Sequence, residues 1–236
     1  DLEDFLRYVH REAGGYADER MLGESFRGGG LDDKGEVSRD SVERRARKLT
    51  SDAELTAFLR SFLSHEDDFP YMLHPWMSDA LGAAEDQKDE NRVRFLARLF
   101  RSIQQATNIG AYGVLAQITE GALLISQGKP QDSLAVLQKA LDMADALADD
   151  PAYDRGGEAP GNDPTRTYWK AQALRYLAKA HAQVPNYLNA ANAAEESLTT
   201  LLARELTLDR QSLAVDTLFE SATYYREVGE FDLAEK

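Results

Sequence analysis

Residues Gly128–Leu141 read GKPQDSLAVLQKAL. The stretch opens with a turn glycine and continues into a segment whose residues Ser133, Leu137 and Ala140 share one face at helical spacing. The small residue Gly121 lies in the segment before the turn. Small residues on facing helices allow the two helices to approach closely, so this stretch predicts an antiparallel helical hairpin.

The same register occurs three times along the second half of the chain. Pairs of small residues fall at 121 and 133, at 178 and 190, and at 222 and 234, and turns fall at Gly128, Pro185 and Gly229. The turns are 57 and 44 residues apart. Part of the longer interval is the run 149–164, DDPAYDRGGEAPGNDP, which is rich in Pro, Gly and Asp and predicts a surface loop.

This register resembles that of tetratricopeptide repeats (TPR), which are helical hairpins of about 34 residues. The resemblance covers residues 110–236, with wider spacing and longer helices than the family has. It implies an all-α fold, an α-α superhelix of TPR-like antiparallel hairpins, preceded by an N-terminal helical segment. We expect two domains, 1–88 and 89–236. Since the register stops inside a third hairpin, we also expect a fragment truncated at its C-terminus.

The N-terminal segment does not show the repeat. Helices are expected at 2–13, 38–49, 51–64 and 70–82. Ser51 and Glu54 form a capping box at the start of the third of these. An apolar stripe at helical spacing follows it, made of Leu55, Phe58, Leu59 and Phe62. The aromatic run 70–76, PYMLHPW, is expected to anchor these helices, or alternatively to form an exposed docking patch.

Composition narrows the classes of function. The net charge of −14 argues against general nucleic-acid binding, because the chain repels phosphate backbones. Cysteine is absent, which fits the cytoplasm and excludes thiol chemistry. No apolar run reaches the roughly 18 residues of a membrane span. The four histidines show no metal-binding spacing, and no catalytic motif is present, so we expect no metal, no cofactor and no enzymatic activity.

In TPR arrays the first helix of each hairpin lines a concave, partner-binding surface. Carried over to this chain, the resemblance implies nine contact residues: Leu115, Ile118, Gln172, Arg175, Tyr176, Lys179, Phe219, Thr223 and Arg226. Three of them, Arg175, Tyr176 and Lys179, form a basic and aromatic spot in a half of the chain that is otherwise acidic. That spot predicts an acidic protein or peptide segment as the partner. An alternative basic surface lies on one helical face at Arg94, Arg98 and Arg101. The opposite face of the same helix is expected to face a core, with Leu96, Leu99, Phe100 and Ile103.

The sequence therefore favours a non-catalytic scaffold for protein–protein interaction within a larger protein. Its partner is a second protein or a neighbouring domain. One alternative is the regulatory or sensor arm of a bacterial signalling protein, such as a transcription regulator, a signalling ATPase or a caspase-like protease. A second is a nucleic-acid-associated subunit that uses the arginine-rich faces. The oligomeric state is left open.

Overall fold

The computed structural model describes residues 39–63, 80–82, 89–147, 164–203 and 208–234. The chain divides into two compact units. Asp1–Asp79 group with Gln105–Asn108, and Ala80–Gln104 group with Ile109–Lys236. The helix expected at 2–13, the aromatic run 70–76 and most of the loop 149–164 lie outside the described residues.

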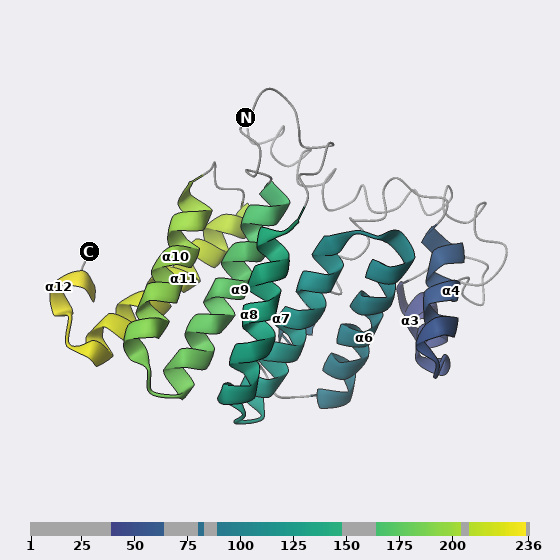
Figure 1. The fold of residues 1–236 in the computed structure, drawn as a ribbon, viewed down its shortest axis with the longest axis horizontal. Coiled ribbons are helices and arrows are strands. Elements are labelled where there is room, and N and C mark those ends of the chain that lie inside the picture. Colours follow the sequence, from purple (N-terminus) through teal and green to yellow (C-terminus); the bar gives the residue numbers. More distant parts are fainter. Residues whose placement is uncertain (1–38, 64–79, 83–88, 148–163, 204–207, 235–236) are drawn as a thin grey trace, which may run out of the picture. The chain divides into compact units, whose positions relative to one another are not determined.

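Every regular element in the described ranges is a helix, so the all-α fold class is confirmed there (Figure 1). The helices are α3 (Arg39–Lys48), α4 (Asp52–Leu63), α6 (Glu90–Thr107), α7 (Gly110–Ser126), α8 (Pro130–Asp145), α9 (Pro164–Gln183), α10 (Tyr187–Leu202), α11 (Leu208–Val228) and α12 (Phe231–Ala234).

In the first unit, α3 and α4 begin and end close to the bounds expected from the sequence. The hydroxyl of Ser51 accepts a hydrogen bond from the Glu54 backbone N–H at 3.3 Å, which confirms the predicted cap of α4. Leu55 and Leu59 from the apolar stripe are fully buried. Thr56 donates a hydrogen bond to the side chain of Gln105 at 3.1 Å, and both residues belong to this first unit.

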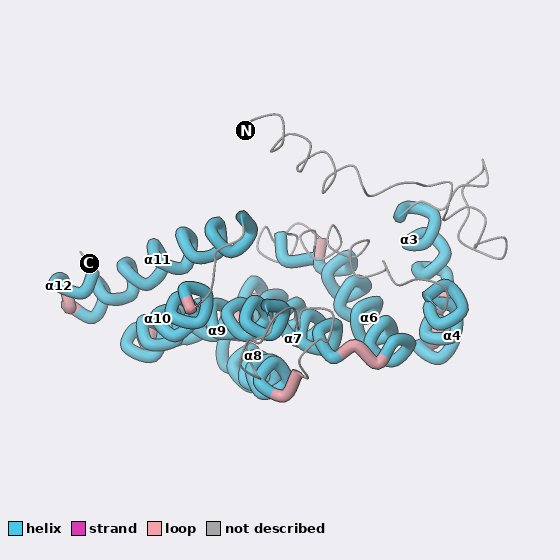
Figure 2. Tube along the Cα trace, turned by 90° about the horizontal axis from the view of Figure 1, so that it is seen from above, coloured by secondary structure: helices cyan, strands magenta, loops and turns pink. Residues whose placement is uncertain are grey.

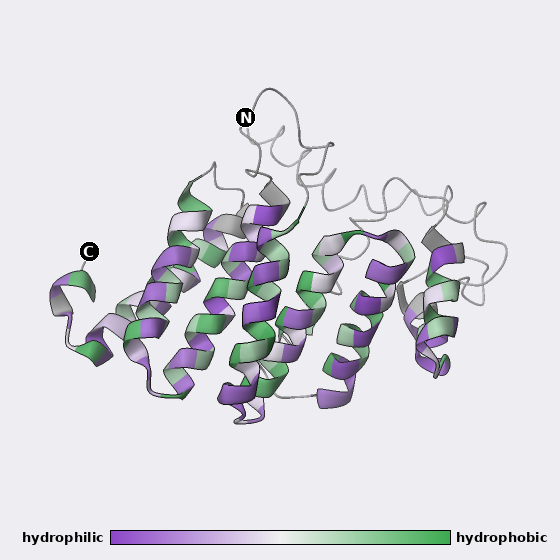
Figure 3. Cartoon of the chain, viewed as in Figure 1, coloured by the Kyte–Doolittle hydropathy of each residue, from purple (hydrophilic) through white to green (hydrophobic). Residues whose placement is uncertain are grey.

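In the second unit, α6 has the predicted amphipathic pattern. Its buried residues include the four that were expected to face a core, Leu96, Leu99, Phe100 and Ile103. Figure 3 shows hydrophilic positions, in purple, on the visible faces of α6 and α8. The polar face of α6 includes Arg94 and Arg101, which are exposed.

The three expected turns share one backbone hydrogen bond. In each, an N–H just after the turn bonds to a carbonyl five residues earlier at 2.9 Å: Lys129 to Leu124, Asn186 to His181, and Glu230 to Tyr225. This is the bond of a Schellman helix end, which requires a left-handed residue after the helix. Gly128 and Gly229 supply it, with φ of +70° and +89°. At the remaining turn Pro185 has a smaller positive φ of +23°. The three positions identified from sequence therefore share this hydrogen bond.

The two helices on either side of each turn pack against each other as a pair. α7 packs against α8, α9 against α10, and α11 against α12. In addition, α9 contacts both helices of the preceding pair as well as α11. Figure 2 shows α8 on one side of α9 and α11 on the other. Each pair thus packs against the next, and α9 is enclosed from both sides.

Small residues set the close approach of the paired helices, as the register predicts. A Cβ added at Gly121 on α7 would lie 2.4 Å from a methyl group of Leu137 on α8. Ala178 of α9 and Ala190 of α10 are fully buried in one cluster with Tyr224 of α11. The Ser197 hydroxyl on α10 donates to the Ala171 carbonyl on α9 at 2.8 Å. Backbones at this distance leave no room for larger side chains between them.

Candidate partner-binding surface

The structure divides the nine contact residues implied by the resemblance into a buried group and an accessible group. The buried side chains are Leu115, Ile118, Gln172 and Tyr176. Arg175 and Lys179 are partly buried, and Phe219, Thr223 and Arg226 are exposed. A buried side chain cannot contact a partner while its helices stay packed. The accessible part of the expected surface is therefore α11 together with the edge of α9.

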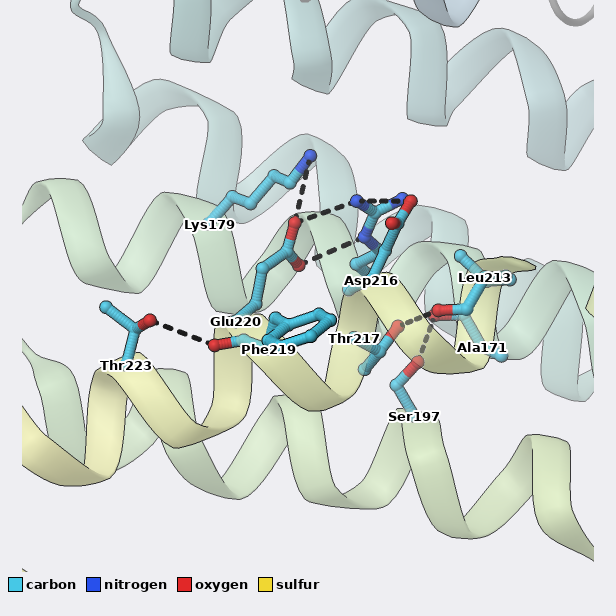
Figure 4. Close-up of polar contacts among 10 residues, drawn as sticks. Ala171, Lys179, Ser197, Leu213, Asp216, Thr217, Phe219, Glu220 and Thr223 are labelled. Carbon is cyan, nitrogen blue, oxygen red and sulfur yellow. Dashed lines mark hydrogen bonds and ion pairs between the residues drawn. The ribbon is translucent and has the colours of Figure 1, made fainter. Parts of the chain in front are cut away.

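Arg175 and Lys179 of α9 are paired with carboxylates of α11 (Figure 4). Arg175 makes a bidentate contact with Glu220, donating from Nε to Oε2 at 3.0 Å and from Nη2 to Oε1 at 2.8 Å. Its Nη2 also lies 3.4 Å from Asp216 Oδ2. Lys179 Nζ lies 3.5 Å from Glu220 Oε1. Two cations and two carboxylates thus form one cluster between neighbouring helices.

This cluster changes the interpretation of the basic spot. The Arg175 side chain is only 12% exposed, and its planar fork is already matched by the Glu220 carboxylate. Lys179 lies over the ring of Tyr176, 4.9 Å from its centroid. An acidic segment would have to displace Glu220 and Asp216 to reach these cations. The expected attraction for an acidic partner is therefore offset within the chain itself.

The exposed face of α11 is more apolar than the sequence reasoning anticipated. Phe219 is 70% exposed, Val215 is 51% exposed and Leu218 is 47% exposed. The hydroxyl of Thr223 donates to the Phe219 carbonyl at 2.9 Å, so it is turned back onto its own helix. Val215 and Leu218 were not among the predicted contact residues. The signal that could have identified them is the i, i+3, i+4 spacing of Val215, Leu218 and Phe219.

The alternative arginine face on α6 is also partly neutralised. Arg94 Nε donates to Glu90 at 2.8 Å, and Arg101 forms an ion pair with Glu120 of α7. Arg98 is partly buried. The guanidinium groups of Arg94 and Arg101 therefore each carry a carboxylate partner. Paired arginines attract a phosphate backbone less strongly than the sequence alone suggests.

Two tyrosines of α11 have raised pKa values. Burial, with the nearby Glu220 carboxylate as the second cause, raises the pKa of Tyr224 to about 12. The hydroxyl of Tyr225 donates to Glu195 of α10 at 2.5 Å. That hydrogen bond is the main cause that raises the pKa of Tyr225 to about 12. Both phenols stay neutral at ordinary pH. Tyr224 serves as a packing group in the buried cluster with α9 and α10, and Tyr225 as a hydrogen-bond donor between α11 and α10. Burial lowers the pKa of His181 at the end of α9.

Comparison with known proteins gives no match: no family model, no curated protein and no solved structure is similar to this chain. Within the described ranges, no helix is both long and apolar enough to cross a membrane. Among the same residues, no group of three or more His, Asp and Glu side chains is placed to hold a metal ion. What the surface offers chemically is an apolar face on α11 beside a closed cluster of ion pairs.

Proposed function

We propose that this chain is a TPR-like array of helical hairpins that binds another protein through the exposed face of α11, without catalysing a reaction. The array is supported by the backbone hydrogen bond that the three helix ends share and by the enclosure of α9 by the pairs on either side. Arrays of this kind present extended surfaces to partner proteins.

The observation that carries the proposal is the exposure of Phe219. Large aromatic side chains are enriched among the residues that dominate binding energy at protein interfaces. Phe219 is 70% exposed and lies next to two further exposed apolar residues, Val215 and Leu218. Single exposed apolar residues are ordinary, but a group of three on one helix face marks an interaction surface.

Neither alternative function has comparable support. The arginine face on α6 is paired with Glu90 and Glu120, which weakens the nucleic-acid interpretation. A regulatory arm would use the same protein-binding surface toward a neighbouring domain. It is therefore contained in the proposal rather than opposed to it.

The test uses a displayed library of random 16-residue peptides with the wild-type chain as bait. Enriched peptides are synthesised and titrated against the wild type, Phe219→Ser and Leu188→Ser. Leu188 is a matched control, because it is an apolar residue on α10 that is 54% exposed. We expect Phe219→Ser to weaken binding at least about tenfold, the loss of roughly 1.4 kcal/mol, and Leu188→Ser to leave it unchanged. Peptides that bind all three proteins equally would place the binding surface elsewhere.

A further inference from the structure

The buried face of α11 is made mainly of small and polar residues. Within 211–228 the buried side chains are Leu213, Ala214, Thr217, Ser221 and Tyr224. The buried residues of α7 include several larger aliphatic side chains: Val114, Leu115, Ile118 and Leu123. Burial of apolar surface is the main favourable contribution to packing. The packing of α11 therefore depends less on apolar burial than the packing of α7 does.

Two small apolar clusters lie toward the two ends of this buried face, with a polar part between them. The cluster near the start of α11 combines residues of three helices: Ala171, Leu201, Leu213 and Ala214. The other cluster joins Tyr224 to alanines of α9 and α10. Between these positions in sequence, α9 provides Arg175 and α11 provides Asp216 and Glu220 (Figure 4). The contact between α11 and α9 is thus centred on ion pairs.

The central ion pair is largely removed from water. The Arg175 side chain is 12% exposed and the Glu220 side chain is 22% exposed. Ions that leave water lose hydration, so a buried ion pair stabilises a contact less than well-packed apolar side chains of the same volume. Both ions regain hydration when the two helices separate. Removing one partner alone is costly, because the other charge then stays buried without it. The cluster therefore determines how firmly α11 is held against α9.

We propose that α11, together with α12, is a strap that opens from α9 and α10 along the ion-pair cluster while α7, α8, α9 and α10 stay folded. Proteins open locally in cooperative units, and the units with few buried apolar contacts open most readily. Opening uncovers the guanidinium group of Arg175 and the ammonium group of Lys179, which are paired with Glu220 in the closed state. The strap thereby controls access to these two cations. This inference goes beyond the proposed function, because it holds whatever binds the exposed face of α11.

The absence of cysteine from the chain allows opening to be followed by thiol labelling. Ala214→Cys places a thiol on the buried face of α11, and Ala140→Cys places one at a buried position of α8 as the matched control. Each variant of the 236-residue chain is treated with iodoacetamide without denaturant, and its labelling rate is divided by that of the same variant unfolded in urea. If Ala214→Cys does not keep the circular dichroism of wild type, the nearly isosteric Ser221→Cys on the same buried face replaces it.

We expect Ala214→Cys to be labelled at least about tenfold faster than Ala140→Cys, each relative to its unfolded rate. Arg175→Met in the Ala214→Cys background removes the bidentate partner of Glu220 and should speed labelling at least about tenfold. Adding Glu220→Leu should reverse that increase, because the contact then becomes apolar. Arg94→Met, which breaks an exposed ion pair within α6, should leave the labelling rate unchanged.

Two results would overturn the inference. If the thiol on α8 is labelled as fast as the thiol on α11, or faster, α11 does not open separately from the other helices. If Arg175→Met leaves the labelling of Ala214→Cys unchanged, the ion-pair cluster does not hold the strap. Neither readout involves Phe219 or a bound peptide. The strap and the proposed function can therefore fail independently of each other.

Discussion

Two glycines on α7 allow a matched test of how closely the helices pack. A Cβ added at Gly121 would lie 2.4 Å from Leu137 Cδ2 and 2.5 Å from its Cγ, and Leu137 is fully buried on α8. A Cβ added at Gly113 would lie 2.5 Å from the side-chain oxygen of Gln104. The two gaps are nearly equal, but the neighbours differ. Leu137 is fixed in the core, whereas Gln104 is partly exposed and its flexible amide can rotate away.

The expected magnitudes follow from that difference. Replacing a glycine in a helix by alanine stabilises it by about 1 kcal/mol through backbone entropy. At Gly121 the new methyl group also overpacks the core, which costs about 1–3 kcal/mol. We therefore expect Gly121→Ala to lower the free energy of unfolding by about 1 kcal/mol. Gly113→Ala should raise it by up to about 1 kcal/mol, because Gln104 moves at little cost.

The assay is urea unfolding followed by circular dichroism. With a slope of about 2 kcal/mol per molar urea, the two variants should differ in midpoint by roughly 1 M. Leu137→Ala removes the obstructing side chain and itself costs about 2–5 kcal/mol. In that background Gly121→Ala should become stabilising, so the sign of its effect reverses. If Gly121→Ala is as stable as Gly113→Ala, or stays destabilising without the Leu137 side chain, the close approach of α7 and α8 at Gly121 is refuted.

Three further perturbations test other parts of the structure. Gly128→Ala should lower the free energy of unfolding by about 1 kcal/mol through backbone strain alone, because φ at Gly128 is +70° and nothing lies within 4 Å of an added Cβ. A urea midpoint equal to wild type would contradict the left-handed turn. Arg175→Met should destabilise the fold by about 1–2 kcal/mol, because it leaves the half-buried Glu220 with only Lys179 as a partner, and adding Glu220→Leu should recover most of that loss. If the effects of the two changes on urea unfolding are additive, the pair is not coupled. The Tyr224 pKa of about 12 exceeds the value near 10 of an unfolded tyrosine, so the folded state holds the proton more tightly and the free energy of unfolding should fall as pH rises from about 10 to 12. Tyr224→Phe should make that fall shallower, and an unchanged pH profile would argue against the burial of the phenol.

Local features of the fold could be predicted from the sequence because they depend on short-range chemistry. The Ser51 cap of α4 and the core face of α6 require only residues within a few positions of each other. The turns at Gly128, Pro185 and Gly229 were predictable from the register of small residues, and in the structure they share one backbone hydrogen bond. The packing of α7 on α8 follows from the same register, since Gly121 permits contact with Leu137.

The site was harder to predict because it depends on residues far apart in sequence. Arg175 and Glu220 are 45 residues apart, so the periodicity of either helix alone does not show that they pair. The register does contain the missing information. In a TPR-like register, Arg175 and Lys179 lie at expected contact positions on the first helix of one hairpin, and Asp216 and Glu220 lie at expected contact positions on the first helix of the next. Comparing those positions between neighbouring repeats would have predicted the ion-pair cluster.

Exposure on α11 has a different origin, because it depends on what covers the helix and not on the helix itself. The spacing of Val215, Leu218 and Phe219 identifies an apolar face, but it does not show whether another helix covers that face. In the structure α12, which packs against α11, is a helix of four residues, and Leu218 is 47% exposed. The same side chain that would be core in a covered helix therefore becomes part of the candidate binding surface. A sequence specifies which faces of a helix are apolar, whereas the identity of the contacting helix decides whether such a face is core or interface.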